Sequence, residues 1–282
     1  MTPGLDFALG AMACFGVSDL IYKRGAAAGI ATGDFLMLQA WIFWPGMTLY
    51  AWLSGTLEPQ LPALWGALAG LFLFVALYNF TQSLHGGAVS TNAPIFRLNF
   101  TVTAALAIAV LREPLTATKA IALACALGAA WLLLAEAGRE RGKLDFASLG
   151  RVLLATAAMA LTNLFYKIGL LHGAVPETMV VAQAWIFCPL ATLAGYLPQR
   201  RFRIPRGAWP YSALAALALF GAFVLLMHGL ARGPASVLVP VAQMSFVITA
   251  LVGIAAFRER LDLRKGAGLA VAAVALVLFA VS

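Results

Sequence analysis

The sequence is poor in charged residues for its length. Only 11% of its 282 residues are Asp, Glu, Lys or Arg, whereas 62% are hydrophobic. A soluble domain carries charge at about 25% of its positions. Because so few polar residues cannot cover a globule in water, lipid must cover most of the surface. The composition therefore predicts a membrane protein.

Cysteine and histidine are also scarce, with three residues of each. Cys14, Cys125 and Cys188 lie inside apolar runs, and the sequence has no Cys-x-x-Cys pair or Cys/His cluster. This pattern argues against a disulfide framework and a zinc site. The HExxH, GxSxG and paired-aspartate motifs of intramembrane enzymes are missing as well. We therefore expect no cofactor, no metal and no enzymatic activity.

Acidic residues are rarer than basic ones, so the net charge is +8. In a soluble protein this excess would suggest nucleic acid as a partner. No basic stretch is interleaved with aromatic residues in the manner of a nucleic-acid surface, so we expect no nucleic-acid partner. In a membrane protein, Lys and Arg collect in cytoplasmic loops. The expected partners are the lipid bilayer and a small-molecule substrate.

Long apolar runs fill the sequence. A spanning helix needs about 20 apolar residues. We expect ten such helices, at 5–23, 33–53, 63–84, 88–110, 117–136, 148–168, 177–197, 208–230, 235–256 and 265–281. The first run has no basic segment before it and no cleavage site after it, so we expect it to span the membrane. The sequence predicts an all-α membrane protein with ten transmembrane helices.

The sequence repeats itself. The segment Gln39–Pro45 returns as Gln183–Pro189, 144 residues later, and matches farther along each half are offset by 146. We predict a first repeat at 1–138, a basic linker at 139–147 and a second repeat at 148–282. Each repeat has five helices, so the second must enter the membrane from the opposite side. This predicts two inverted repeats around a central cavity.

The basic residues are distributed unevenly between the two sides. Fourteen of the 19 lie in or beside odd-numbered connections between the apolar runs, and three lie in even-numbered ones. The positive-inside rule then places the odd connections in the cytoplasm. We expect a multi-pass protein of the bacterial inner membrane, working as a monomer, with both termini in the periplasm.

A charged signature precedes the last helix of each repeat. It is Arg112–Lys119 (Arg-Glu-Pro-Leu-Thr-Ala-Thr-Lys) in the first and Arg258–Lys265 (Arg-Glu-Arg-Leu-Asp-Leu-Arg-Lys) in the second. With ten spans in two five-helix repeats, the chain resembles the EamA type of the drug/metabolite transporter superfamily. The resemblance implies a secondary carrier with a central cavity, most similar to bacterial exporters of aromatic amino acids. We expect Glu113 and Glu259 of the signature to interact with helix N-termini.

Arg97 is the most informative single residue. It lies near the middle of an apolar run, where its charge costs about 2.5–3.5 kcal/mol. It could grip a substrate carboxylate through two hydrogen bonds, or it could form a structural ion pair with Asp19. Gln243 is its counterpart in the second repeat, which favours a site that faces the cavity. Lys23 and Lys167 lie near helix ends and are expected to extend to the membrane interface.

Other polar residues lie within the apolar runs at helical spacing. Asp19 could bind a substrate ammonium or a proton, or it could only neutralise Arg97 or Lys23. We predict that the substrate-binding residues are Arg97, Asp19, Tyr78, Gln82, His85, Asn99, Asn163, Tyr166, His228 and Gln243. Aromatic rings interleaved with amides suit a substrate that is partly apolar and partly zwitterionic. The alternative for each is ordinary hydrogen bonding between helices, and for His228 also a proton relay.

Four prolines lie inside the apolar runs at matched positions of the two repeats. They are Pro45 with Pro189, and Pro94 with Pro240. Each removes a backbone donor and leaves a carbonyl four residues earlier without its helical partner. Paired kinks of this kind are expected in the moving helices of an alternating-access carrier.

Composition leaves three kinds of transported substrate open. The leading hypothesis is export of amino acids, aromatic or apolar ones first. An exchanger of nucleotide sugars or organophosphates should place several Lys or Arg in its cavity, and only Arg97 qualifies clearly. An exporter of organic cations should have a deep Glu, and the only acid well inside a run of the first repeat is Asp19.

Overall fold

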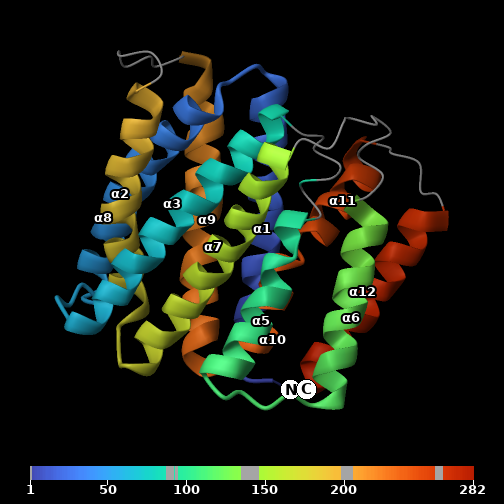
Figure 1. Ribbon diagram of the computed structural model, residues 1–282. Helices are drawn as coiled ribbons and strands as arrows, with labels where there is room; N and C mark the ends of the chain where they lie inside the picture. The colour runs from blue at the N-terminus through green and yellow to red at the C-terminus, as the bar shows by residue number, and fades with distance from the viewer. Residues whose placement is uncertain (1, 87–91, 93–94, 135–145, 198–205, 258–262) are drawn as a thin grey trace.

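The computed structural model describes residues 2–86, 92, 95–134, 146–197, 206–257 and 263–282, and every regular element in these ranges is a helix (Figure 1). The α-helices are α1 (Leu5–Ala27), α2 (Thr32–Leu53), α3 (Leu64–Gly86), α5 (Asn99–Val110), α6 (Ala117–Leu134), α7 (Phe146–Leu171), α8 (Pro176–Tyr196), α9 (Trp209–Arg232), α10 (Ala235–Gln243), α11 (Ser245–Phe257) and α12 (Leu263–Val281). Short 3₁₀ turns, Leu61–Ala63 and Arg206–Ala208, precede α3 and α9.

Seven of the described helices are long and apolar enough to cross a membrane, and two shorter apolar helices cover 95–110 and 117–133. The second expected span, α2, is not among the seven although it has 22 residues. Its three tryptophans, with Asp34, Gln39 and Pro45, lower its mean hydropathy. The protein is therefore an all-helical membrane protein with several candidate spans, while the number ten stays a prediction.

Two expected helices are not continuous. The expected helix 235–256 is divided into α10 and α11 at Met244, and the expected helix 88–110 is interrupted at Leu98. Residues 88–91 and 93–94 of the latter lie outside the described residues. Leu98 and Met244 are 146 positions apart, so both interruptions fall at the same place in the repeated sequence.

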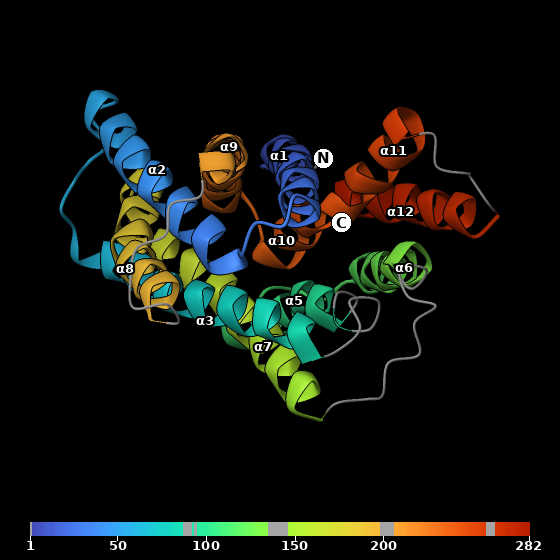
Figure 2. The same cartoon turned by 90° about the horizontal axis from the view of Figure 1, so that it is seen from above.

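The main helix packing joins the first half of the chain to the second. α1 packs on α9, α3 on α7, α2 on α8, α5 on α10, and α6 on α12. Viewed from above, α6 and α12 lie together beside the other helices (Figure 2). Because each principal pair takes one member from each half, neither half can form its packed core alone.

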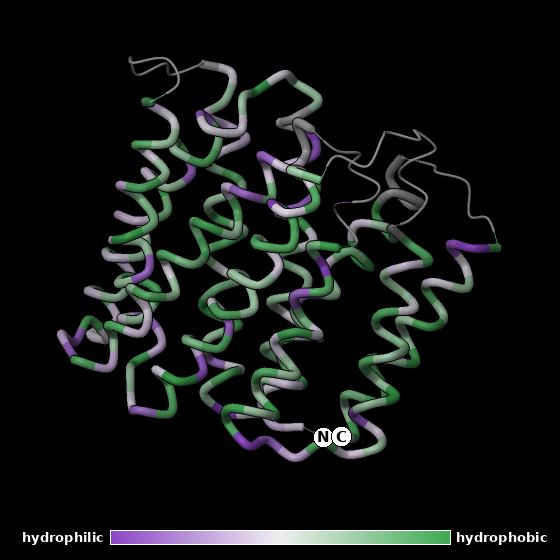
Figure 3. Tube along the Cα trace, viewed as in Figure 1, coloured by the Kyte–Doolittle hydropathy of each residue, from purple (hydrophilic) through white to green (hydrophobic). Residues whose placement is uncertain are grey.

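Hydrophobic residues predominate along the lengths of the helices (Figure 3). Large side chains such as Trp131, Leu217 and Val277 are each about two-thirds exposed. Such exposure would be costly in water but suits contact with acyl chains. Both chain ends lie together at one end of the bundle, where the Thr2 hydroxyl donates to the carbonyl oxygens of Phe279 at 2.8 Å and Ser282 at 3.0 Å (Figure 1).

Glycine allows α3 and α8 to approach closely. A Cβ atom at Gly70 would lie 2.4 Å from the carbonyl oxygen of Gln183, and one at Gly66 would lie 2.3 Å from that of Met179. Because these neighbours are backbone atoms of a packed helix, they cannot rotate away. The two helices must separate to admit a methyl group.

We expect Gly70→Ala to destabilise the protein by about 1–3 kcal/mol, the usual cost of overpacking. Gly46→Ala is the matched control, because Gly46 also lies inside a helix but a Cβ there would meet no atom within 4 Å. The apparent unfolding temperature in detergent should fall for the first variant and be unchanged or rise for the second. Equal unfolding temperatures in both variants would contradict this packing.

Candidate substrate site

The interruption between α10 and α11 is a local loss of helical geometry. Met244 has a ψ of 19°, and its N–H donates to the carbonyls of both Pro240 and Val241 at 3.1 Å. The N–H of Val247 then donates to the Met244 carbonyl, three residues back, at 2.9 Å. Three-residue spacing is typical of a tightened 3₁₀ turn. The polar side chains beside Met244 are thereby turned toward neighbouring helices.

Asp19 and Arg97 form an ion pair beside the two interruptions. Arg97 Nη2 donates to Asp19 Oδ2 at 2.8 Å, and Arg97 Nη1 donates to Gln243 Oε1 at 3.4 Å. The hydroxyl of Ser245 donates to the same Asp19 oxygen at 2.8 Å. The cluster thus joins α1, the turn before α5, and the α10–α11 junction. Of its members, Asp19, Arg97 and Gln243 were predicted and Ser245 was not.

Ser245 could have been found from the repeat. It stands 146 positions after Asn99, which is one of the predicted residues, and it directly follows the interruption. Arg97 and Gln243 flank the two interruptions on the other side. In each repeat, a polar residue lies on either side of the helix interruption. This repeated pattern was not noticed in the sequence.

The ion pair is partly open to solvent. The side chain of Arg97 is 19% exposed and that of Asp19 is 32% exposed. Buried polar groups lie close to it in sequence, since the hydroxyl of Ser18 and Oδ1 of Asn99 have no hydrogen-bond partner among the described residues. The site therefore combines two partly exposed opposite charges with buried polar atoms, close in sequence, that have no hydrogen-bond partner among the described residues.

Asn99 and Asn163 belong to a second, buried chain of contacts. Asn99 Nδ2 donates to the Phe96 carbonyl at 2.7 Å, and the Thr103 hydroxyl donates to the Asn99 carbonyl at 2.8 Å. Asn163 Nδ2 reaches the Thr103 hydroxyl at 3.4 Å. This chain ties α5 to α7, and the buried side-chain oxygen of Asn99 has no hydrogen-bond partner among the described residues.

Tyr166 is enclosed in the protein. It is 1% exposed, and its hydroxyl donates to Gln183 Oε1 on α8. Tyr22 makes the corresponding bond to Gln39 in the first half, at an offset of 144 for both partners. The two bonds fasten α7 to α8 and α1 to α2. In this conformation Tyr166 holds helices together and does not contact the Arg97 pair.

The predicted face of α3 is only partly described. Tyr78 is 38% exposed and stacks on Phe74 with a ring-centroid distance of 5.7 Å. Gln82 is partly buried, while the side chain of His85 lies outside the described residues. Neither Tyr78 nor Gln82 makes a hydrogen bond to Arg97 or Asp19 in the described structure, and the roles predicted for these two residues and for His85 stay predictions.

The prolines differ in their effects. Pro45 and Pro189 lie inside α2 and α8, which continue through them. Pro240 also lies inside α10, and the interruption comes four residues later, at Met244. Pro94 lies outside the described residues. α10 ends with its C-cap at Met244 and not at Pro240, so a kink at the proline itself stays a prediction.

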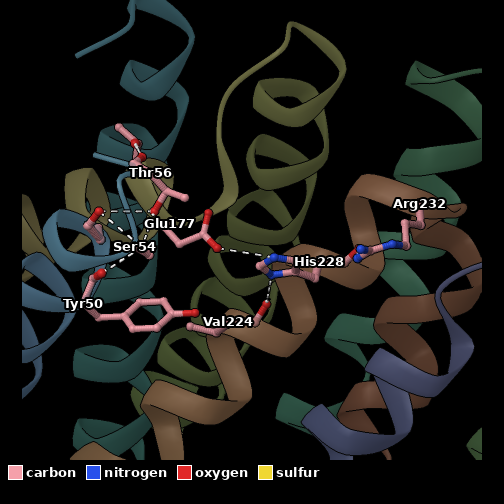
Figure 4. Close-up of polar contacts among 9 residues, drawn as sticks. Tyr50, Ser54, Thr56, Glu177, Val224, His228 and Arg232 are labelled. Carbon is pink, nitrogen blue, oxygen red and sulfur yellow. Dashed lines mark hydrogen bonds and ion pairs between the residues drawn. The ribbon is translucent and has the colours of Figure 1, made fainter. Parts of the chain in front are cut away.

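His228 lies apart from the Arg97 pair, near the end of α9. Its Nε2 is 3.3 Å from Glu177 Oε1, in the first turn of α8, and its Nδ1 is 2.9 Å from the Val224 carbonyl oxygen (Figure 4). His228 makes no hydrogen bond to Arg97 or Asp19 in the described structure, and its role in substrate binding stays a prediction. Its partner Glu177, the first residue of the expected helix 177–197, was not singled out from the sequence.

One carboxylate holds the start of α10 and one cation holds the end of α9. Glu113 accepts from the N–H groups of Ala235 at 2.8 Å and Ser236 at 2.9 Å, so the prediction that it interacts with a helix N-terminus is confirmed. Lys167 is 8% exposed and donates to the carbonyls of Leu230 at 2.7 Å and Gly233 at 2.8 Å. Its expected extension to the interface is wrong, because these carbonyls at the end of α9 bind its ammonium. Glu259 lies outside the described residues.

Two hollows on the described surface lie elsewhere. One, of about 360 Å³, is lined by α2 residues including Trp44 and Pro45, and the other, of about 340 Å³, lies between α3 and α8 beside Trp185. Neither contains the Arg97 pair, so the predicted central cavity stays a prediction. Within the described ranges, no three His, Cys, Asp or Glu side chains come together to hold a metal ion.

The ion pair should stabilise the fold measurably. We expect Arg97→Gln to lower the free energy of unfolding by about 1–2 kcal/mol, the range for a hydrogen bond to a charged group that is partly solvated. The loss is smaller than for a fully buried pair, because Asp19 keeps its bond to Ser245 and is in part exposed. Adding Asp19→Asn should recover most of it in a double-mutant cycle followed by thermal unfolding. Additive losses would contradict direct coupling between the two side chains.

Comparison with known proteins adds the family. The EamA-like transporter family matches residues 2–135 and again residues 149–281. A curated protein from Sinorhizobium sp, described as an uncharacterized transporter in the cobO 3' region, is 28% identical over 131 residues, which are 46% of this chain and 93% of that protein. A solved structure described only as "Crystal structure of protein" shares the fold with a TM-score of 0.80, at 15% identity over 97% of both chains.

Proposed function

Because the chain belongs to the EamA-like transporter family and so transports small molecules across a membrane, we propose that its substrates are zwitterions. Amino acids with an apolar or aromatic side chain are the first candidates, exported across the bacterial inner membrane. The observation that carries this proposal is the partly exposed pair of Asp19 and Arg97 beside two interrupted helices.

A zwitterion can replace each partner of the ion pair with one of its own charges. Its carboxylate takes the place of Asp19 on the Arg97 guanidinium, which can donate two parallel hydrogen bonds. Its ammonium takes the place of Arg97 on Asp19, where Ser245 already orients the carboxylate. Each of the two partly exposed charges then keeps an opposite partner, so binding leaves neither charge unpaired in an apolar bundle.

The interrupted helices supply further polar groups. Half-helix ends carry partial charges and unpaired backbone groups, and transporters place such ends at their substrate sites. The end of α10 presents Gln243 to Arg97, and the start of α11 presents Ser245 to Asp19. A substrate that separates the ion pair therefore also disturbs the junction between the two half-helices.

This coupling suits alternating access between two inverted repeats of five helices, at 1–138 and 148–282, that surround a central cavity. Matched Tyr–Gln bonds at an offset of 144, matched interruptions at an offset of 146, and principal packing between the halves all support this arrangement. We propose Pro45, Pro94, Pro189 and Pro240 as points of flexibility near the moving segments.

The topology proposed with this function has ten spans, both termini in the periplasm and a monomer as the working unit. The excess of basic residues in the odd-numbered connections supports the orientation. The two chain ends meet at one end of the bundle, which supports their placement on one side of the membrane.

Counterflow in proteoliposomes tests the substrate class. The purified protein is loaded with L-phenylalanine, and uptake is compared for L-phenylalanine, its amide and its N-acetyl derivative. The amide lacks the carboxylate that Arg97 would bind, and the N-acetyl compound lacks the ammonium that Asp19 would bind. We expect each derivative to be carried at least about tenfold more slowly, because each leaves one of the two partly exposed charges without an opposite partner.

The same assay separates the competing substrate classes. Faster counterflow of a phosphorylated sugar or a quaternary ammonium compound than of any amino acid would contradict the proposal. Gly46→Ala protein is a suitable control for the effect of mutagenesis, because that position contacts nothing within 4 Å of an added Cβ.

A further inference from the structure

Two apolar hollows lie on the outer surface where α2, α3 and α8 meet. The first, of about 360 Å³, is lined by α2 and the connection after it, through Trp44, Pro45, Thr48, Leu49, Trp52 and Leu57. The second, of about 340 Å³, is lined by the start of α3 and the first half of α8, including Ala67, Ala182 and Trp185. Because α2 and α8 pack on each other, the two hollows are neighbours (Figure 1).

One pair of aromatic rings separates the hollows. Trp44 lines the first and Trp185 the second, and their rings meet edge to face with centroids 5.0 Å apart. The connection between α2 and α3 borders both hollows, since Leu57 lines the first while Pro59 and Gln60 line the second. The hollows therefore share a partition and a rim.

The rim lies at the boundary of the membrane. Residues 54–60 are not helical and are at least partly exposed. Exposed non-helical backbone cannot lie in the hydrocarbon, where its N–H and C=O groups would lack partners. Trp52, two-thirds exposed in the last turn of α2, suits the aromatic belt at the same level. Both hollows thus begin at the level of the lipid headgroups.

The hollows extend inward along the helices and suit apolar chains. From Trp52 to Trp44 the first hollow covers eight helical steps, about 12 Å at 1.5 Å per residue. The hydrocarbon of one leaflet is about 15 Å deep. Both hydroxyls in the lining are engaged within the protein, since Thr48 donates to the Trp44 carbonyl at 2.8 Å and Thr178 to the Thr56 carbonyl at 2.6 Å.

The rim is held in place by the same threonine. The N–H of Glu58 donates to the Thr178 hydroxyl at 3.1 Å, which fastens the connection to the first turns of α8. The position of the Glu58 backbone between the two hollows is therefore fixed by a bond that does not involve its carboxylate.

The rim carries a negative charge and, within residues 54–60, no positive one. Glu58 is exposed, accepts a hydrogen bond from the Gln60 side chain and forms no ion pair with a described residue. No residue that lines either hollow is Lys or Arg. A carboxylate repels an anionic headgroup, whereas a primary ammonium can donate a charge-assisted hydrogen bond to it. A quaternary ammonium has the charge but no hydrogen to donate.

We propose that the two hollows bind one two-chain phospholipid with a primary ammonium headgroup, of the phosphatidylethanolamine type. One acyl chain lies in each hollow, on either side of the Trp44–Trp185 partition, and the ammonium binds Glu58. The lipid then covers the contact between α2 and α8, which come from different halves of the chain. This site shares no residue with the Arg97 pair and is distinct from the proposed substrate site.

Native mass spectrometry of the purified full-length protein, titrated in detergent with dioleoyl lipids, tests the site. We expect one phosphatidylethanolamine to bind at least about tenfold more tightly than phosphatidylglycerol, which is anionic, or phosphatidylcholine, which has no N–H. Lysophosphatidylethanolamine should also bind at least about tenfold more weakly, because its single chain leaves one hollow empty. Equal affinity for phosphatidylethanolamine and any of the other three would overturn the proposal.

Two variants separate the headgroup contact from the chain contact. Glu58→Gln should abolish the preference for phosphatidylethanolamine over phosphatidylglycerol, and Ala182→Leu should weaken phosphatidylethanolamine at least about tenfold by filling the second hollow. Asp6→Asn is the control for the first, because Asp6 is an exposed acid that lines neither hollow. Ala124→Leu, at an exposed position of α6, is the control for the second.

Both controls should bind lipid as the wild type does. Preserved phosphatidylethanolamine preference in Glu58→Gln, or wild-type affinity in Ala182→Leu, would contradict the proposal. Should Ala182→Leu not fold, Glu58→Gln decides alone, because it changes an exposed side chain. The readout is lipid binding, so its result does not depend on which substrate the protein carries.

Discussion

The contact between the Arg97 guanidinium and the Asp19 carboxylate is the interaction on which the centre of this protein depends. Either charge alone would be costly in an apolar bundle, and the pair makes both acceptable. The ion pair also depends on the local geometry of the interrupted helices. The interruptions at Leu98 and Met244 let Gln243 and Ser245 reach it, so charge and helix geometry support each other.

The half-helix α10 needs support of its own because it has only nine residues. A short helix leaves a large share of its backbone groups without intrahelical partners. Glu113 binds two N–H groups at its start, while Lys119 donates to Ser236 at 2.9 Å. Lys167 binds the carbonyls that end α9 just before it. These charges fix the entry to α10, while its exit at Met244 stays beside the ion pair.

Sequence patterns predicted most of the helices because the boundaries of a helix depend mainly on the residues near them in the sequence. Apolar length and flanking Gly, Pro and charge determine where a helix begins and ends, and α8 at Pro176–Tyr196 differs by one residue at each end from the expected 177–197. The interruptions were missed because Met244 and Leu98 are ordinary helix formers. Their backbone geometry depends on side chains that lie far away in sequence.

The candidate site was also predictable only in part, because some of its residues are evident from the local sequence and others depend on tertiary packing. Arg97, Asp19 and Gln243 stand out as polar residues in apolar runs, and the ion pair was one of two stated alternatives. The Glu177–His228 contact was not foreseen, because it joins residues about 50 positions apart whose spacing follows no repeat. Tyr166 likewise resembled a cavity residue, yet its burial against Gln183 depends on how α7 meets α8.

The central claim is that a zwitterion takes the ion pair apart and replaces both partners. Calorimetric titration of L-phenylalanine into the purified Asp19→Asn/Arg97→Gln double variant tests it most directly, since that variant keeps neutral hydrogen-bonding groups at both positions. The account predicts a folded protein whose affinity is at least about 100-fold weaker than that of the wild type, because two charge-assisted contacts are lost. Wild-type affinity in a folded double variant would contradict it.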